Sequence, residues 1–225
     1  MLLPKFSRFL PLALILASSV FALAKEHDFA KWEKDIAAFQ TRDQASTPAK
    51  GGIVFVGSST IVRWKTLATD FPGLNIMNRG FGGNEIEDCT HFAEQTIFPY
   101  EPKMIFLRAG GNDIHAGKTP ERVFADFKDF VATVHARLPD TEILYISMSP
   151  SIARLNEIDK NKAANELIAQ YCKDHPKLKY IETYDLPLGS DGQPRPELFV
   201  EDKLHFSPAG YELLAARVRP FMPKP

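Results

Sequence analysis

A pair of serines follows a short apolar segment, at a position suited to nucleophilic chemistry. Residues 53–56 are all apolar and lie between Gly52 and Gly57, as in a strand buried on both faces of a parallel sheet. Ser58 and Ser59 come next and open a short helical pattern. Free backbone N–H groups at such a junction can stabilise an oxygen that becomes an anion. The same pattern also fits serines that only cap a helix.

A nucleophilic serine needs a base, and His205 is the strongest candidate among six histidines. Asp202 precedes it by three residues, in a polar loop ahead of a helix that Ser207 should cap. One turn of chain can bring this carboxylate to the imidazole Nδ1, which leaves Nε2 to accept the serine proton. His115, in a loop after Asp113, stays open as a residue that lines the same pocket.

Two further segments could donate hydrogen bonds to an oxyanion. Asn112 follows Gly110 and Gly111 at the end of an apolar segment, and its amide NH2 donates without carrying a charge. Gly83 lies where a helix should begin, so its N–H would be open to a ligand oxygen. Both segments could instead be ordinary turns.

The elements that must position these residues form an alternating pattern. Five apolar segments of strand type alternate with helical patterns, which indicates a parallel sheet covered on both faces. Ligands of such sheets bind beyond the carboxyl ends of the strands, where the segments of Ser59, Gly83 and Asn112 all lie. The expected strands are 53–56, 74–78, 104–107, 142–148 and 178–181; the expected helices are 29–39, 61–67, 86–97, 119–138, 155–172 and 208–218.

Together, these motifs resemble the SGNH (GDSL-type) hydrolase family, and more loosely its bacterial members similar to platelet-activating-factor acetylhydrolase catalytic subunits. Its four sequence blocks are matched in order by Gly57-Ser58-Ser59, by Gly83 within Gly80–Gly83, by Gly110–Asp113 and by Asp202–His205. The chain departs from the family at Ser58, where the name-giving block has Asp. Because that residue is not the attacking group, we expect a local change in hydrogen bonding rather than lost activity.

The resemblance implies a fold and a role for each residue. The fold is a flavodoxin-like three-layer α/β/α sandwich with a parallel five-stranded sheet of order 2-1-3-4-5. Ser59 is the nucleophile, His205 the general base and acid, and Asp202 the carboxylate that orients it. The backbone N–H groups of Ser59 and Gly83 and the side chain of Asn112 form the oxyanion hole. Such acyl transfer needs no metal or organic cofactor, and no metal-ligand spacing is visible.

The composition of the chain indicates its functional class, and its first residues indicate where the protein is located in the cell. The 225 residues carry a net charge of −1 without a block of like charges, which argues against a nucleic-acid groove. Lys5 and Arg8 precede an apolar segment that ends at Ala22-Leu23-Ala24, a pattern typical of a secretory signal. We therefore predict a signal peptide over 1–24, cleaved after Ala24, and a secreted or periplasmic protein without a stable membrane span. An uncleaved anchor is the alternative.

The remaining chain divides into an N-terminal helix and linker (25–50) and a hydrolase domain (51–225). Cys89 and Cys172 could form one disulfide in an exported protein, or each could be a small buried residue. The sequence leaves the oligomeric state open.

These features predict a carboxylic-ester hydrolase that acts on small-molecule or glycan esters through an acyl-serine intermediate. We expect short acyl chains, because no long lid segment is evident. Two alternatives are an acyltransferase that uses the same triad on an envelope polysaccharide, and a catalytically silent carbohydrate-binding module.

Overall fold

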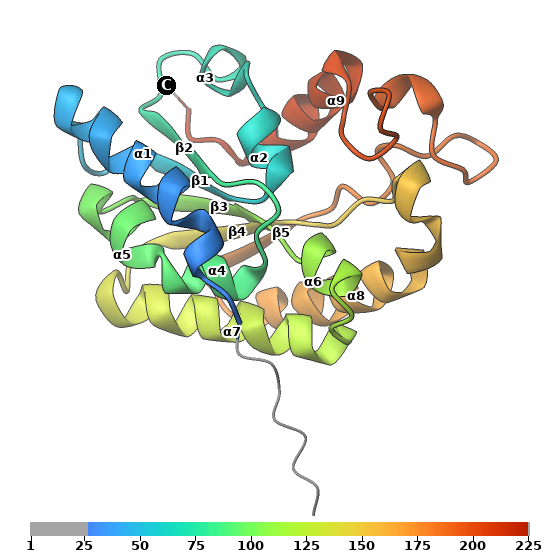
Figure 1. The fold of residues 1–225 in the computed structure, drawn as a ribbon, viewed down its shortest axis with the longest axis horizontal. Coiled ribbons are helices and arrows are strands. Elements are labelled where there is room, and N and C mark those ends of the chain that lie inside the picture. The colour runs from blue at the N-terminus through green and yellow to red at the C-terminus, as the bar shows by residue number, and fades with distance from the viewer. Residues whose placement is uncertain (1–26, 225) are drawn as a thin grey trace, which may run out of the picture.

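Residues 27–224 are described by this computed structural model, and they form three layers around one sheet (Figure 1). The predicted signal peptide, 1–24, lies outside the described residues. All strand pairs are parallel, and the sheet order is β2-β1-β3-β4-β5, which confirms the expected fold. The strands are β1 (Ile53–Gly57), β2 (Ile76–Gly80), β3 (Met104–Arg108), β4 (Glu142–Ile146) and β5 (Leu178–Ile181).

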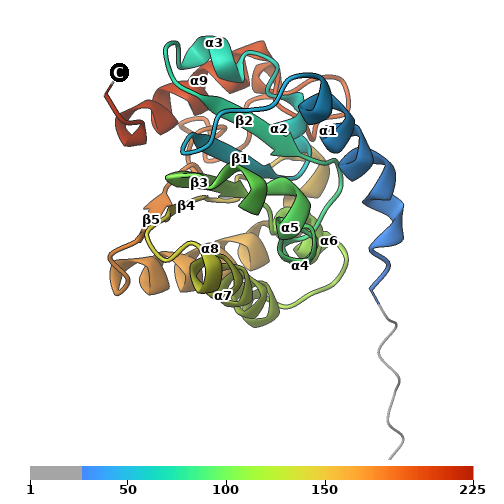
Figure 2. The same cartoon turned by 90° about the vertical axis from the view of Figure 1, so that its left-hand side faces the viewer.

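Alternating side chains of the strands feed two separate cores. In β1, Val54 and Val56 face the larger core, whereas Ile53 and Phe55 face the smaller one. Residues of α1 (Glu33–Ala45), α4 (Ile86–His91), α5 (Ala93–Thr96), α6 (Gly111–His115), α7 (Pro120–Arg137) and α8 (Ile158–Lys173) contribute to the larger core. The smaller core takes in α2 (Ser59–Arg63), α3 (Leu67–Asp70) and α9 (Pro208–Val218), and Figure 2 shows these two layers on opposite faces of the sheet.

Several expected elements differ in extent from the structure. The fourth strand, expected over 142–148, ends at Ile146, and the helix expected over 29–39 continues to Ala45. The helix expected over 61–67 is divided into α2 and α3. The second strand begins at Ile76 rather than at residue 74, because pairing with β1 starts at Ile53 opposite Ile76 and runs to Gly80. The helix expected over 86–97 is interrupted at Phe92, whose ψ of 14° ends α4. This break lets the Phe92 ring pack edge-on against Phe81 and Phe29.

Two other segments differ from expectation in their type of structure: one is a helix instead of a loop, and one begins as a 3-10 helix instead of an α-helix. Residues 111–115, expected in a loop at the end of a strand, form the short helix α6. The helix expected from residue 155 begins as a 3-10 segment, Ile152–Glu157, with non-helical backbone angles at Arg154. The cap predicted at Ser207 is correct, since its side chain accepts the Gly210 N–H at the start of α9. Thr119 caps α7 in the same way, by accepting the Arg122 N–H. Among residues 27–224, no helix is both long and apolar enough to span a bilayer.

Gly57 is the residue at which β1 turns toward α2, and its conformation excludes a side chain. Its φ is +140°, and a Cβ would lie 2.1 Å from the carbonyl oxygen of Arg108 on the adjacent strand. Neither backbone can move without breaking the pairing of β1 with β3. Glycine is therefore required here by both conformation and space.

We expect Gly57→Ala to lower the free energy of unfolding by about 2–4 kcal/mol, because it adds strain and overlap at a buried site. Urea denaturation of the purified proteins measures this change. Gly82→Ala is the matched control, since a Cβ there meets nothing within 4 Å. Equal stability of the two variants would contradict the argument.

Candidate active site

Ser59 is the first residue of α2 and lies just beyond the carboxyl end of β1. The turn is fixed from both sides. The Ser58 N–H donates to the Arg108 carbonyl of β3 at 3.0 Å, and the Ser58 carbonyl accepts the N–H of Ile61 at 2.9 Å. The Ser59 hydroxyl is thus held at the carboxyl edge of the sheet. Ser58, which stands where the family has Asp, makes no side-chain cap to the helix.

His205 reaches the same edge from the opposite end of the chain. Its carbonyl accepts the Val200 N–H at 2.9 Å, and Phe199 and Phe206 pair as an antiparallel bridge. These contacts close a tight loop immediately before α9. Tyr211 of α9 then donates its hydroxyl proton to the Thr60 carbonyl of α2 at 2.9 Å, which ties the two helices together.

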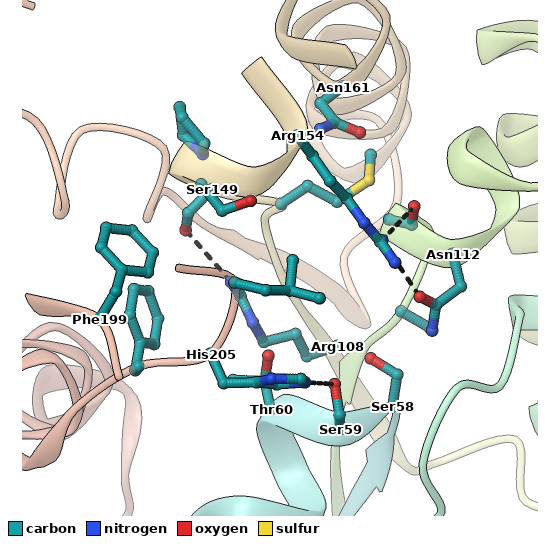
Figure 3. A pocket seen from close by; sticks show the side chains of 17 residues that line it. Ser58, Ser59, Thr60, Arg108, Asn112, Ser149, Arg154, Asn161, Phe199 and His205 are labelled. Carbon is teal, nitrogen blue, oxygen red and sulfur yellow. Dashed lines mark hydrogen bonds between the residues drawn. The ribbon is translucent and has the colours of Figure 1, made fainter. Parts of the chain in front are cut away.

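The three residues of the expected triad form one hydrogen-bonded chain. Ser59 Oγ lies 2.9 Å from His205 Nε2, as Figure 3 shows, and His205 Nδ1 lies 2.7 Å from Asp202 Oδ2. The other Asp202 oxygen accepts the backbone N–H groups of His205 and Leu204, both at 2.9 Å. When Nδ1 donates to the carboxylate, Nε2 has its lone pair directed at the serine hydroxyl.

The Asp202 carboxylate is ionised, and its side chain is 41% exposed. The backbone N–H of His205, its imidazole and the N–H of Leu204 stabilise the anion and hold the Asp202 pKa well below its usual range. A charged carboxylate keeps the Nδ1–H tautomer of the imidazole in place. The histidine is thereby prepared to accept a proton at Nε2.

Asn112, the expected side-chain donor, lies on α6 in the pocket of Ser59 and His205. Its Nδ2 donates one proton to the Asn84 carbonyl at 2.9 Å, and its Oδ1 accepts from Arg154 Nη1 at 3.2 Å. These two contacts fix which end of the amide is the donor. The second Nδ2 proton has no acceptor among the described residues, so it can donate to a ligand.

Gly83 lies in the loop next to this pocket and is not among the residues that line it. Its φ is +78°, and no atom within 4 Å would meet a Cβ, so the backbone there is open. The neighbouring Asn84 donates to the Gly57 carbonyl at 3.2 Å, and the Trp32 indole donates to the Gly82 carbonyl at 2.9 Å. The loop is well anchored, and the role of the Gly83 N–H stays a prediction.

A cluster of charges beneath that loop connects it to α6 and α7. Burial lowers the pKa of Lys118, but nearby carboxylates outweigh this effect and raise it well above the ordinary value. Its Nζ contacts Glu87 at 2.5 Å, Asp126 at 2.8 Å, Glu85 at 2.9 Å and Asp113 at 3.3 Å. Asp113, the residue after Asn112, also accepts the Ile86 N–H, and burial raises its pKa to about 6.

This cluster also contains the only group of His, Cys, Asp and Glu side chains within residues 27–224 whose spacing would suit a metal ion. Ligand atoms of His27, Glu85 and Glu87 lie within 4.8 Å of one another. The ammonium of Lys118 already contacts both glutamates, at 2.9 and 2.5 Å. Lys118 therefore already supplies a positive charge to both glutamates of this group.

The pocket around Ser59 and His205 has a volume of about 90 Å³. Six polar residues that the sequence analysis did not single out line it: Thr60, Arg108, Ser149, Ser151, Arg154 and Asn161. Figure 3 labels all of them except Ser151. The only sequence signal was a charge at the end of an otherwise apolar strand, at Arg108. His115 does not line the pocket; it is exposed and lies 2.6 Å from Glu157.

The two cysteines are free thiols, and both are buried. Burial raises the pKa of Cys89 well above its ordinary value and that of Cys172 to about 12. Of the two possibilities that the sequence left open, the structure has the buried residues and not the disulfide.

Comparison with known proteins identifies the family. Residues 55–213 match the GDSL-like lipase/acylhydrolase family, which is most of the chain. The chain belongs to this family. It is accordingly a hydrolase that acts on esters, as the sequence motifs predicted.

Among curated proteins, the chain is similar to platelet-activating factor acetylhydrolase IB subunit alpha1 of cattle and of humans. Identity is 26% over 168 residues in both cases, which covers 71% of this chain and 69% and 70% of those proteins. A Streptococcus pneumoniae structure has a TM-score of 0.76 at 20% identity and covers 85% of this chain and 92% of its own.

A second structural neighbour is an acetyl-xylooligosaccharide esterase from Geobacillus stearothermophilus. It has a TM-score of 0.61 at 14% identity and covers 78% of this chain and 96% of its own. At these identities the structural matches bear on the fold alone, and they agree with the sheet order found here.

We expect Lys118→Met to lower the free energy of unfolding by about 3 kcal/mol or more, because it leaves several carboxylates without their cation. Thermal and urea unfolding measure the loss. Lys50→Met is the control, since the Lys50–Glu101 pair is exposed and such pairs contribute about 0–1 kcal/mol. Loss of stability of the same size in both variants would show that the cluster does not anchor the fold.

Proposed function

We propose that this family member hydrolyses short-chain carboxylic esters through an acyl-Ser59 intermediate. The observation that carries the proposal is the continuous chain from Ser59 Oγ to His205 Nε2 at 2.9 Å and from His205 Nδ1 to Asp202 Oδ2 at 2.7 Å. A histidine that is bonded on both sides in this way can remove the serine proton and later return it.

The first half of the proposed reaction forms the acyl-enzyme. His205 Nε2 takes the proton of Ser59 Oγ as this oxygen attacks the ester carbonyl carbon. The carbonyl oxygen becomes an oxyanion, to which the Asn112 NH2 and the backbone N–H groups of Ser59 and Gly83 donate. The tetrahedral species then collapses: the bond to the alcohol oxygen breaks, and that oxygen receives the proton from His205.

The second half repeats these steps with water. His205 removes a proton from water, whose oxygen attacks the acyl carbon, and the bond to Ser59 Oγ breaks as Oγ takes the proton back. Asp202 keeps its negative charge throughout and stabilises the imidazolium that forms twice in each cycle. The enzyme therefore ends in its starting protonation state.

A preference for short acyl chains is supported by the size of the pocket. Its volume of about 90 Å³ is well below the roughly 300–1,000 Å³ that is typical of drug-sized ligand sites. The names of two relatives refer to acetyl groups, on platelet-activating factor and on xylooligosaccharides. An acetyl or similarly short acyl group is the best fit to both observations.

We expect Ser59→Ala and His205→Ala each to lower kcat for p-nitrophenyl acetate by roughly 10⁴-fold or more, because each removes a member of one cooperating unit. Asn112→Ala should cost on the order of 10²–10³-fold, the usual effect of one oxyanion donor. Ser58→Ala is the matched comparison, and it should retain far more activity than Ser59→Ala. Near-parental turnover by Ser59→Ala would reject the mechanism, provided that circular dichroism shows folded protein.

We expect kcat/KM to fall by about 100-fold or more from p-nitrophenyl acetate to the octanoate, because the longer chain does not fit the pocket and displaces the carbonyl carbon from Ser59. Both esters share one leaving group, and their rates without enzyme correct for intrinsic reactivity. A rising series from acetate to octanoate would contradict the assignment of short chains.

A further inference from the structure

Two arginines are buried among residues 27–224, and only one of them has a carboxylate partner. Arg79 is 6% exposed and is paired with Asp43 at 2.6 Å. Arg108 is 8% exposed, and its acceptors are all neutral: the Ser147 carbonyl, Thr183 Oγ1 at 3.1 Å and Ser149 Oγ at 3.2 Å. A buried cation without a counter-charge costs several kcal/mol, so its retention needs a reason.

Arg108 also has donors to spare, and it lines the pocket of the catalytic serine. A guanidinium carries five N–H groups, and within the described chain only three are matched by acceptors. Burial lowers the pKa of Arg108 to about 10, so the group remains a cation at neutral pH. Its position next to Ser149 and near His205 can be followed in Figure 3.

A second cation, Arg154, lies on another wall of the same pocket (Figure 3). One of its nitrogens donates to the Gly111 carbonyl at 3.1 Å and to Asn112 Oδ1 at 3.2 Å, and no carboxylate of residues 27–224 lies within salt-bridge distance. Its other N–H groups have no acceptor among the described residues and can donate to a ligand. Both walls therefore present guanidinium donors to the space beside Ser59.

The rest of the pocket lining adds no negative charge beside these two arginines. The 17 residues around the pocket include no aspartate or glutamate. Asn161 of α8 is only 5% exposed, and its Oδ1 has no hydrogen-bond partner in the part of the chain that the structure describes. The Asn161 oxygen can accept a hydrogen bond from a hydroxyl of a ligand, whereas the two guanidinium groups, which have no carboxylate partner among the described residues, can donate to an anionic group.

We propose that the pocket recognises an ester that carries a carboxylate or similar anionic group near the scissile bond, held between Arg108 and Arg154. The proposal rests on the assignment of Ser59 as the nucleophile and narrows its substrates to acidic esters. A planar guanidinium can bind a carboxylate through two parallel hydrogen bonds, and Arg108 and Arg154 both have the donors for it. The anion then supplies the counter-charge that the fold itself gives to Arg79 but not to Arg108.

The anion could belong to either half of the ester, and two pairs of substrates distinguish these sources. For the alcohol half, 3-acetoxybenzoate is compared with its neutral methyl ester. For the acyl half, phenyl hydrogen succinate is compared with methyl phenyl succinate. Within each pair the same ester bond is broken. Phenyl hydrogen succinate also loses phenol without enzyme, through attack of its own carboxylate. The rates without enzyme are therefore subtracted, and the ratio of the corrected kcat/KM values reports recognition of the anion.

We expect at least one anionic ester to be preferred over its neutral partner by about tenfold or more, the usual effect of a charge-assisted hydrogen bond. The ratio should fall toward one in Arg154→Gln and Arg108→Gln, partly recover in Arg108→Lys, and stay unchanged in the control Arg137→Gln. Arg137 is exposed and pairs with Glu94 outside the pocket. Because Arg154 also contacts Asn112, its variant is judged by the ratio and not by the absolute rate.

Equal kcat/KM values within both pairs, together with normal turnover of the neutral esters, would overturn the proposal and leave the esterase mechanism standing. Calorimetric binding of the same esters to Ser59→Ala measures recognition of the anion without turnover. Tighter binding of an anionic member shows that the pocket recognises the anion, independently of the role of Ser59, whereas equal affinities reject recognition of the anion. If Arg108→Gln does not fold, the parental ratios and Arg154→Gln decide the outcome.

Discussion

The contact between α9 and α2 is the constraint on which the site depends, because it joins residues 151 positions apart and brings His205 to Ser59, 146 positions away. The Tyr211 hydroxyl donates to the Thr60 carbonyl, and its ring lies 5.9 Å from Trp64 and 6.0 Å from Phe206. These residues belong to the smaller core, on the same face of the sheet. The packing that buries apolar surface on this face therefore also holds the His205 loop over the start of α2. The same apolar packing therefore contributes both to the stability of the fold and to the geometry of the site.

The other side of the pocket is held by polar contacts instead of apolar packing. Asn112 is set by Asn84 and Arg154, and the loop of Asn84 is tied to α6 and α7 through Asp113 and Lys118. Buried polar groups with several partners have one favourable arrangement, because any shift leaves a donor or a carboxylate unsatisfied. An oxyanion donor needs such precision, since a misplaced hydrogen bond loses its effect on the transition state.

The sequence predicted those parts of the molecule that local patterns determine. Short apolar segments separated by helical ones indicate a parallel sheet, and parallel strands place their carboxyl ends at one edge. This is why Ser59 and Asn112 could be assigned to one site, and why Asp202 could be paired with His205 across a single turn. The strand order and each residue's role came from the family resemblance. The start of β2 was misplaced, because the apolar pattern cannot show where pairing with β1 begins.

The site residues that the sequence did not predict have roles that depend on which residues, distant in sequence, contact them in the fold. An arginine at the end of a strand looks the same in the sequence whether a carboxylate faces it, as at Arg79, or only neutral oxygens do, as at Arg108. The difference has a consequence for the chemistry. Two unpaired cations in a small pocket raise its electrostatic potential, and this favours negative charge on the reacting carbonyl oxygen as well as on a bound carboxylate. The positive potential of the two arginines thus also promotes turnover of neutral esters. Only the difference in kcat/KM between charged and neutral esters therefore measures recognition of the substrate's anionic group.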